Sequence, residues 1–345
     1  MIARKVAVIP GDGIGPEVVA EAIHVLLDVG GVEIEQLPWS ANHFLQTGVT
    51  VPSGGYDTLR SFDAIFVGAL GDPRVPDNRH ARDILLGTRF ELDLYVNYRP
   101  VRLLDDRLCP LKNRTRNHVN FVVFRENTEG LYVGAGGRVH ADTDEEIAVQ
   151  EEVNTYRGVR RIIRYAFDFA AERGLTRVCM ADKSNAMTHG HALWQRVFKE
   201  LSPQYPPIEA THLYIDALAM FLVQSPEQFQ VIVTNNLFGD IVTDIGAALQ
   251  GGLGMAASGN IHPGRTSMFE PVHGSAPPLA GKNVANPIGA ILSAALMLET
   301  LGRVEDARRI ERAVEGAVHA GETTRDIGGP LGTREAGAAI LKRLG

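Results

Sequence analysis

The sequence predicts an α/β protein with a mixed, largely parallel sheet, because short apolar segments alternate with amphipathic ones along the chain. Residues 5–9 have the length and composition of a buried strand, and a helical pattern of apolar residues begins after Pro16. Polar residues recur directly after the expected strands, where ligands bind in sheets of this kind. The chain has 345 residues, more than one hydrophobic core usually serves, so we expect two domains.

The first expected elements are a strand, a tight turn and a helix. The strand at 5–9 runs into the glycine-rich turn at 11–15. Pro16 suits the first turn of a helix, because the N–H that proline lacks has no hydrogen-bond partner there. The helix that follows keeps its apolar residues on one face, namely Val18, Val19, Ala22, Ile23, Leu26 and Leu27.

The later segments continue the alternation. An amphipathic pattern predicts a helix over residues 156–173, ended by Gly174. Residues 133–150 differ, because glycines are followed by a run of acidic residues, and we expect an exposed arm or hairpin there. The other expected elements are strands at 64–67, 119–124, 177–180, 212–215 and 230–234 and an apolar helix at 286–301.

Composition excludes several classes of protein. A net charge of −7 and a pI near 5.9 argue against a general binder of nucleic acids or membrane surfaces. Apolar runs stay well short of the roughly 18 residues of a membrane-spanning helix, so a cytoplasmic protein is expected. Cys109 and Cys179 lack metal-ligand spacing and are predicted to be buried or incidental thiols rather than a redox pair.

The segment 269–277 has the most distinctive composition of the chain. It contains a carboxylate, an imidazole and a hydroxyl, and Pro271 and Pro277 restrict its backbone. Gly274 allows another group to approach the backbone closely. A rigid loop with fixed polar groups suits a bound ligand, and the alternative is an ordered surface turn.

The glycine loop at 11–15 resembles a dinucleotide-binding fingerprint only in part. A G-x-G-x-x-G pattern that starts at Gly11 needs glycine at position 16, which is Pro16. A nucleotide could be bound here, but we do not expect the usual pyrophosphate loop. A structural turn and a ligand loop both remain open from this motif alone.

Paired carboxylates suggest a metal site. Asp240 and Asp244 are four residues apart, which places both on one face of a helix. Asp216, at the end of an expected strand, is a candidate third ligand. Oxygen ligands suit Mg²⁺ or Mn²⁺, and the alternative is a solvated acidic helix face.

Three arginines and two candidates for proton transfer are the remaining candidate functional residues. Arg89, Arg99 and Arg125 could bind the carboxylates of a small polyanionic acid, although each alone could be a salt-bridge partner. Lys183 follows an expected strand and could act as a base. Tyr132 could relay a proton.

At these residues the chain resembles the β-decarboxylating dehydrogenases, the family that includes isopropylmalate, isocitrate, homoisocitrate and tartrate/D-malate dehydrogenases. The resemblance runs almost end to end. The motifs that carry it lie at residues 9–17, 125–132, 182–185, 236–240 and 270–277. It implies an isopropylmalate dehydrogenase-like fold of two domains, which is not a Rossmann fold and agrees with the failed glycine spacing. It also implies an NAD(P)-dependent enzyme and the oxidative decarboxylation of a (2R)-malate-type 2-hydroxy acid.

The resemblance also implies roles for individual residues. Lys183 would act as the base on the substrate hydroxyl, and Tyr132 would protonate the enol that remains after CO₂ leaves. Lys183 and Asp216 would come from the neighbouring subunit, which implies a homodimer with shared active sites. The implied substrate-binding residues are Arg89, Arg99, Arg125, Leu85, Leu86 and Asn185; the metal ligands for Mg²⁺ or Mn²⁺ are Asp216, Asp240 and Asp244; and the cofactor-binding residues are Ile14, Glu270, His273, Gly274, Ser275, Ala276 and Asn286.

Substrate and cofactor choice depend on two short stretches. Leu85 and Leu86, in the stretch that contacts the group on C3 in this family, suit an apolar or small substituent, as in 3-isopropylmalate or malate. Residues 39–41, 95–103 and 183–185 look closest to the D-malate/tartrate branch. Arg82 suits the third carboxylate of isocitrate or homoisocitrate, the alternative substrates. Pro278 and Leu279 replace the residues that usually discriminate NAD from NADP, so NAD is expected and NADP is not excluded.

The family implies a discontinuous division of the chain. Residues 1–98 and 252–345 would form the larger, cofactor-binding domain, and residues 99–251 the smaller domain with the dimer interface and the arm at 133–150. Two other classes of protein fit part of the sequence. A non-catalytic partner subunit that binds ligands is disfavoured by the presence of Lys183, Tyr132 and the aspartates, and a metal-dependent hydrolase leaves the loop around His273 without a role.

Overall fold

The computed structural model describes residues 3–345, which form two compact units. The first unit contains the residues up to Leu94, Arg99–Val119 and Ala247–Gly345; the second contains Tyr95–Tyr98 and Asn120–Gly246. Residues 99–119, which we expected in the smaller domain, group with the first unit. One reason is Arg107, whose guanidinium donates to the carbonyls of Ile327 (2.6 Å) and Val318 (2.9 Å).

The strands of the first unit are mostly parallel and buried. Val6 to Ile9 and all of Ala64–Val67 are fully buried, which explains why these strands are continuous apolar runs rather than alternating ones. The antiparallel pair β11–β12 makes the sheet mixed. The strands lie in the order β2 (Val32–Gln36), β1 (Arg4–Ile9), β3 (Ala64–Val67), β12 (Ser267–Pro271), β11 (Ala257–Ile261).

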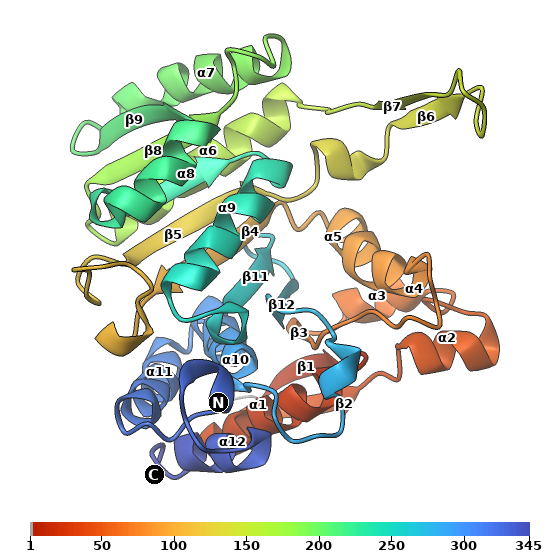
Figure 1. Cartoon of the computed structure of the whole chain (residues 1–345), viewed down its shortest axis with the longest axis vertical. Helices are drawn as coiled ribbons and strands as arrows, with labels where there is room; N and C mark the ends of the chain where they lie inside the picture. The colour runs from red at the N-terminus through yellow and green to blue at the C-terminus, as the bar shows by residue number, and fades with distance from the viewer. Residues whose placement is uncertain (1–2) are drawn as a thin grey trace. The chain divides into compact units, whose positions relative to one another are not determined.

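Helices pack around these strands. The helix α10 is buried on almost every side, because it contacts α1, α11 and the strands β11 and β12. Figure 1 shows α1 and α12 side by side, and the two helices are in contact. The helices of this unit are α1 (Gly15–Val29), α2 (Ala41–Thr47), α3 (Gly55–Arg60), α4 (Arg79–Arg82), α5 (Thr88–Glu91), α10 (Ile288–Thr300), α11 (Val304–His319) and α12 (Thr333–Leu341).

The second unit contains the all-parallel strand order β5-β10-β8-β9, with helices on both faces. Figure 1 shows α8 and α9 on one face of these strands, and α6 packs on the other. The strand β4 (Val96–Arg102) passes from this unit into the first. The elements are β5 (Asn120–Glu126), α6 (Tyr156–Glu172), β8 (Arg177–Asp182), α7 (Gly190–Leu201), β9 (Glu209–Tyr214), α8 (Ile215–Gln224), β10 (Val231–Thr234) and α9 (Asn236–Leu249).

Residues 133–150 contain a two-stranded antiparallel hairpin, β6 (Gly136–Val139) and β7 (Ile147–Gln150). Every residue of both strands is exposed, and Figure 1 shows the hairpin projecting from its own unit. Among the described helices, none combines the length and the apolar character needed to span a bilayer.

The expected elements agree with the structure except at some ends. The expected strand at 5–9 and helix at 156–173 are confirmed as β1 and α6. The expected strand at 212–215 was wrong at its end, because β9 stops at Tyr214 and α8 begins at Ile215. Asp216 therefore lies in the first turn of a helix, where a carboxylate is favoured by the free backbone N–H groups.

A carboxyl group is buried where β5 ends. Glu126 is 2% exposed, and its carboxylate accepts hydrogen bonds from the backbone N–H groups of Thr128 (3.0 Å) and Glu129 (2.7 Å) and from the Thr128 hydroxyl (2.8 Å). Burial, together with the nearby Glu129 carboxylate, raises the pKa of Glu126 to about 7. The folded protein thus binds this proton more tightly than the unfolded chain does.

We expect the stability of the protein to fall as the pH rises from 5 to 8. The contribution of Glu126 is complete below its unfolded pKa of 4.5 and is lost as the pH rises through about 7. The full shift corresponds to at most about 3 kcal/mol. Urea denaturation at several pH values should show this slope, and Glu126→Gln should remove most of it. The exposed Glu145→Gln is the control, and an unchanged slope in Glu126→Gln would contradict the assignment.

Candidate active site

Two loops of the first unit meet where the cofactor-binding residues are expected. The backbone N–H of Ile14 donates to the carbonyl of Ser275 at 2.8 Å. Gly13 has a φ of +57°, and a Cβ there would lie 2.0 Å from the same carbonyl oxygen. Glycine at this position therefore lets the turn at 11–15 contact the loop that follows β12, which brings Ile14 and Ser275 together.

Most of the other expected cofactor residues lie close to Ser275 in the sequence. Burial lowers the pKa of His273, which favours the neutral imidazole, and its Nε2 atom has no hydrogen-bond partner within residues 3–345. Ala276 is held at a φ of 38°, and Gly274 is exposed. Asn286 is buried and accepts the N–H of Ile288 at 3.0 Å, which fixes the start of α10. An unpaired, buried ring nitrogen beside an exposed glycine suits a neutral hydrogen-bonding group of a ligand, such as a hydroxyl or amide of a nicotinamide dinucleotide.

A buried ion pair joins a substrate candidate to a cofactor candidate. Arg89 in α5 and Glu270 in β12 are each 7% exposed, and Nη2 of Arg89 lies 2.8 Å from Oε1 of Glu270. The Nδ2 atom of Asn260 donates to the same oxygen at 2.9 Å. The Nε atom of Arg89 is buried without a hydrogen-bond partner in the described chain. A guanidinium with an unused donor suits the carboxylate of a bound acid.

The remaining substrate candidates of this unit are close in sequence to Arg89 or on β4. Leu85 and Leu86 are half-buried in the π-helical turn Asp83–Gly87, which directly precedes α5. Arg99 lies on β4 and is 7% exposed.

In the second unit, Arg125 forms the centre of a polar cluster. Its guanidinium, on a side chain that is only 1% exposed, donates from Nε (2.9 Å) and Nη2 (2.7 Å) to Oδ1 of Asn236. Its Nη1 atom pairs with Asp240, and the Tyr132 hydroxyl donates to the other oxygen of Asp240 at 3.0 Å. A Cβ on Gly239 would lie 2.5 Å from Cβ of Arg125, so glycine leaves the space that this arginine needs.

Tyr132 has the properties of a proton donor. Burial raises the pKa of its hydroxyl, although the Arg125 guanidinium, 5.1 Å from the ring centroid, opposes the shift. A phenol with a raised pKa stays protonated at neutral pH, as an acid in proton transfer must. Asp244 is exposed one turn further along α9 than Asp240.

Lys183 and Asp216 form a second cluster in this unit. Nζ of Lys183 lies 2.5 Å from Oδ1 of Asp216, and this contact lowers the pKa of the Asp216 carboxyl. The backbone N–H of Lys183 donates to Nδ1 of His191 at 2.7 Å, which fixes the backbone just after β8. Asn185 is exposed in the same loop.

The three expected metal ligands are not gathered within one chain. Asp216 pairs with Lys183, whereas Asp240 pairs with Arg125 and Tyr132. Across residues 3–345, no group of three or more histidine, cysteine or acidic side chains is arranged to hold a metal ion. The resemblance assigns Lys183 and Asp216 to the site of the neighbouring subunit, so a single chain would not complete the set. The carboxylate oxygens fit Mg²⁺ or Mn²⁺ by their chemistry.

Sequence reasoning missed residues that orient the site. Asn236 accepts two hydrogen bonds from Arg125, and the order β5-β10 could have suggested this, because both residues lie at neighbouring strand ends. His191 gave no signal, because a histidine in a helix is ordinary. Asp12 was noted only as part of the glycine loop, yet its carboxylate is a buried hydrogen-bond acceptor.

Comparisons with known proteins show the family of the chain. The family model described as isocitrate/isopropylmalate dehydrogenase matches residues 5–340. The 3-isopropylmalate dehydrogenase of Thermobifida fusca is 46% identical, over 99% of this chain and 97% of that protein. That of Rhodococcus erythropolis is 45% identical, over 99% of this chain and 100% of that protein. The crystal structure of isocitrate dehydrogenase from Methylococcus capsulatus has a TM-score of 0.90 and 37% identity, with 99% of each chain covered.

The match extends over nearly all of the chain, and the fold, the motifs and the curated relatives agree. The chain therefore belongs to the isocitrate/isopropylmalate dehydrogenase family and is an oxidoreductase that oxidises and decarboxylates a 2-hydroxy acid of the malate type.

Proposed function

We propose that the protein converts 3-isopropylmalate to a 2-oxo acid and CO₂, with NAD as hydride acceptor and Mg²⁺ or Mn²⁺ as the metal. The observation that carries this proposal is the position of the half-buried Leu85 and Leu86, which lie one helical turn before the buried Arg89 on one helical segment. Apolar side chains next to a guanidinium suit an acid with an apolar group beside a carboxylate. The curated relatives, 43–46% identical and named 3-isopropylmalate dehydrogenase, support the same substrate.

Different residues of this chain have different roles in the proposed reaction. Arg89, Arg99 and Arg125 bind the substrate carboxylates through charge-assisted hydrogen bonds. Lys183 takes the hydroxyl proton as the hydride leaves C2, and Tyr132 later gives a proton to the enol left by decarboxylation. The metal, when bound by Asp216, Asp240 and Asp244, supplies a Lewis acid that stabilises the negative charge on the substrate oxygen.

The turn after the His273 loop supports NAD rather than NADP. Pro277–Leu279 forms a 3-10 turn in which Pro278 and Leu279 are exposed. Neither side chain carries a charge or a donor for a 2′-phosphate. NAD is therefore the preferred cofactor. Its discrimination from NADP is weakened, because neither Pro278 nor Leu279 has a carboxylate that could bind a ribose hydroxyl.

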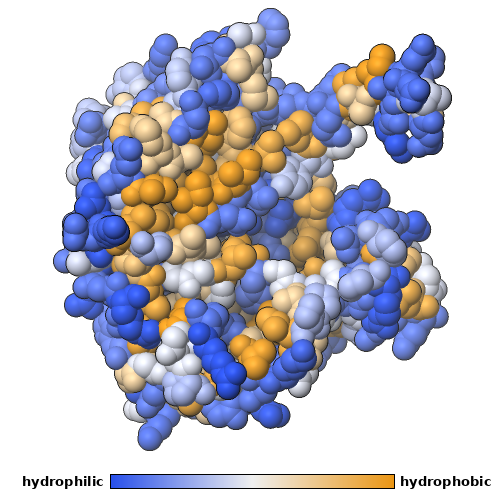
Figure 2. All heavy atoms as spheres, viewed as in Figure 1, coloured by the Kyte–Doolittle hydropathy of each residue, from blue (hydrophilic) through white to orange (hydrophobic). Residues whose placement is uncertain are grey.

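A homodimer is the assembly that this function requires. Figure 2 shows apolar side chains gathered over the face of the second unit that carries α8 and α9. The exposed apolar residues are Met220 and Val223 on α8, Ile241 on α9, and Val139, Ile147 and Val149 on the hairpin. A second copy of the chain would cover this surface and supply its own Lys183 and Asp216. The cytoplasmic location stays a prediction.

The first test is NADH formation with Mn²⁺, measured by absorbance. We expect turnover with 3-isopropylmalate and NAD to exceed turnover with D-malate, D-tartrate, isocitrate and homoisocitrate, and NAD to exceed NADP in kcat/KM. Preference for isocitrate or homoisocitrate would indicate that Arg82 rather than the leucines sets the substrate. No turnover by a folded dimer on any of these acids would contradict the proposal and favour a non-catalytic subunit.

Replacement of the base should stop the oxidation. We expect Lys183→Met to lower kcat by at least about 100-fold, because no other group takes the hydroxyl proton. Mn²⁺ binding, measured by electron paramagnetic resonance, should persist. Lys199→Met, an exposed lysine on α7, is the control. Near-normal turnover of Lys183→Met would remove Lys183 from the mechanism.

Disruption of the apolar surface should separate the subunits. The chain has a mass of 37.5 kDa, and light scattering should give twice this value. A charge at position 223 would have to be buried without a partner in the dimer. We therefore expect Val223→Asp to be monomeric and inactive. The control Leu27→Asp changes an equally exposed residue of α1 and should remain dimeric. An active monomer would contradict the shared site.

A further inference from the structure

Residues 79–91 are three consecutive helical pieces with a widened turn in the middle. The helix α4 (Arg79–Arg82) leads into the π-helical turn Asp83–Gly87, which leads into α5 (Thr88–Glu91). A π turn contains about one residue more than an α turn, so side chains beyond it are rotated by about 100° relative to an unbroken α-helix. The turn therefore decides how Leu85 and Leu86 are oriented relative to Arg89.

Tyr56 fills the inner side of this turn. Its hydroxyl donates to the backbone carbonyl of Asp83 at 2.8 Å, and a Cβ on Gly87 would lie 2.1 Å from the same hydroxyl oxygen. The Thr50 hydroxyl also donates to Oδ2 of Asp83 at 2.7 Å. Asp83 is thus fixed through its backbone and its side chain, and glycine at position 87 makes room for the tyrosine.

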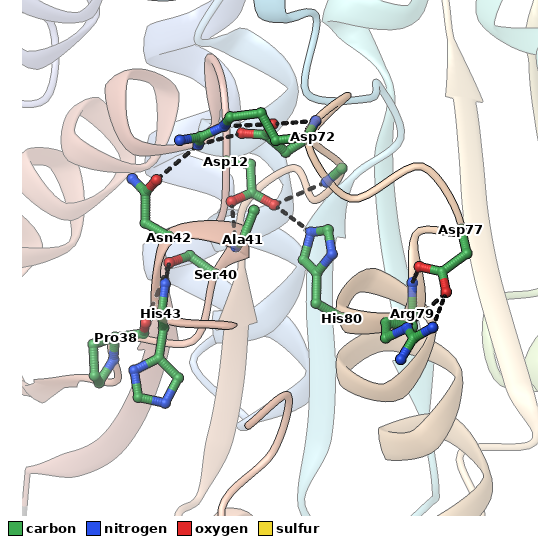
Figure 3. Close-up of polar contacts among 12 residues, drawn as sticks. Asp12, Pro38, Ser40, Ala41, Asn42, His43, Asp72, Asp77, Arg79 and His80 are labelled. Carbon is green, nitrogen blue, oxygen red and sulfur yellow. Dashed lines mark hydrogen bonds and ion pairs between the residues drawn. The ribbon is translucent and has the colours of Figure 1, made fainter. Parts of the chain in front are cut away.

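A second contact fixes the start of the segment. His80 is fully buried, and its Nε2 atom lies 2.9 Å from Oδ2 of Asp12, which is also buried (Figure 3). The Asp12 carboxylate also accepts the backbone N–H groups of Ala41 (2.7 Å) and Gly71 (2.9 Å). This carboxylate joins the glycine loop, the start of α2 and the loop before α4, so the first turn of the segment has a fixed place.

We propose that Tyr56 and His80 are positioning residues that set substrate specificity. They hold the widened turn so that Leu85, Leu86 and Arg89 together recognise a 2-hydroxy acid with a branched apolar group on C3. The proposal rests on the proposed function, because it takes these three residues as substrate contacts. Tyr56 and His80 hold the segment through Asp83, Gly87 and Asp12.

The chemical step should be largely independent of these two positions. The proton-transfer residues Lys183 and Tyr132 and the metal-ligand aspartates belong to the second unit, whereas residues 79–91 belong to the first. Loss of the Tyr56 hydroxyl leaves the Asp83 carbonyl without this donor, and the segment can relax towards a regular α-helix. Arg89 is held separately by its ion pair with Glu270, so the relaxed turn should mainly reorient the two leucines. Recognition of the C3 group should then weaken, while an acid without that group should be affected little.

The test compares 3-isopropylmalate with D-malate, which has no C3 substituent, in Tyr56→Phe. We expect the ratio of kcat/KM for the two acids to fall about tenfold, mainly through a higher KM for 3-isopropylmalate, as for a poorly filled apolar pocket. The values for D-malate should change less than about twofold. If wild-type turnover of D-malate is too slow to measure, the ratio of the two kcat/KM values is replaced by the ratio of the Kd values of the two acids, measured by calorimetry with Mn²⁺. Tyr205→Phe removes a hydroxyl bonded to Asp168 in the other unit and is the control.

Two further measurements separate positioning from simple destabilisation. Hydrogen exchange should speed up at the amides of residues 84–89 in Tyr56→Phe and not in Tyr205→Phe. His80→Leu should lose selectivity, and His80→Gln, whose amide can still donate to Asp12, should recover much of it. Tyr56→Phe keeps the test decisive if His80→Leu does not fold.

The outcomes distinguish this proposal from the proposed function. An equal loss on both acids, or an unchanged ratio, in Tyr56→Phe would overturn the positioning role. A wild-type preference for another C3-substituted acid would contradict only the named substrate, and the ratio would then be taken for that acid against D-malate.

Discussion

The second unit is organised around one buried guanidinium. Arg125 is almost inaccessible to solvent, and a cation in that position is tolerated only if its N–H groups are paired. Asn236, Asp240 and the ring of Tyr132 provide those partners, and each comes from a segment that follows a strand or begins a helix. One arginine therefore orients the amide after β10, a metal-ligand candidate on α9 and the proposed proton donor. The glycine at 239 follows from the same requirement, because any side chain there would displace the arginine.

In the first unit, two buried carboxylates also need partners for their charge. Asp12 and Glu270 are both buried, and both accept several hydrogen bonds, which offsets the cost of removing their charge from water. Glu270 fixes Arg89, and Asp12 fixes the start of the segment that leads to Arg89. Arg89, the proposed substrate-binding arginine, is thus held by its own contact and by a contact at the start of its segment. Such support keeps a functional group in its geometry before the ligand arrives, which lowers the cost of binding.

The sequence was sufficient for the fold class and for most elements, because those depend on local periodicity. Residues 5–9 and 156–173 show the patterns of a buried strand and an amphipathic helix without reference to any other part of the chain. The family motifs, which are also short local patterns, led to the prediction of Lys183, Tyr132 and the arginines as site residues. The contacts between Tyr56 and Asp83 and between Asp12 and His80 were not predictable, because each joins residues that are far apart in sequence and ordinary in type. A π turn has no sequence signature of its own, since it results from what packs inside it.

The division of the charged residues has a mechanistic consequence. In one chain the Lys183 ammonium is neutralised by Asp216 and the Arg125 guanidinium by Asp240, so each half of the expected catalytic set is electrostatically balanced on its own. If Asp240 holds a metal, its carboxylate would be shared between that metal and Arg125, and Nη1 of Arg125 is the donor whose partner would change. The carboxylate of a substrate is the natural replacement. The Arg125–Asp240 pair therefore links an expected metal ligand to an arginine that is expected to bind a substrate carboxylate.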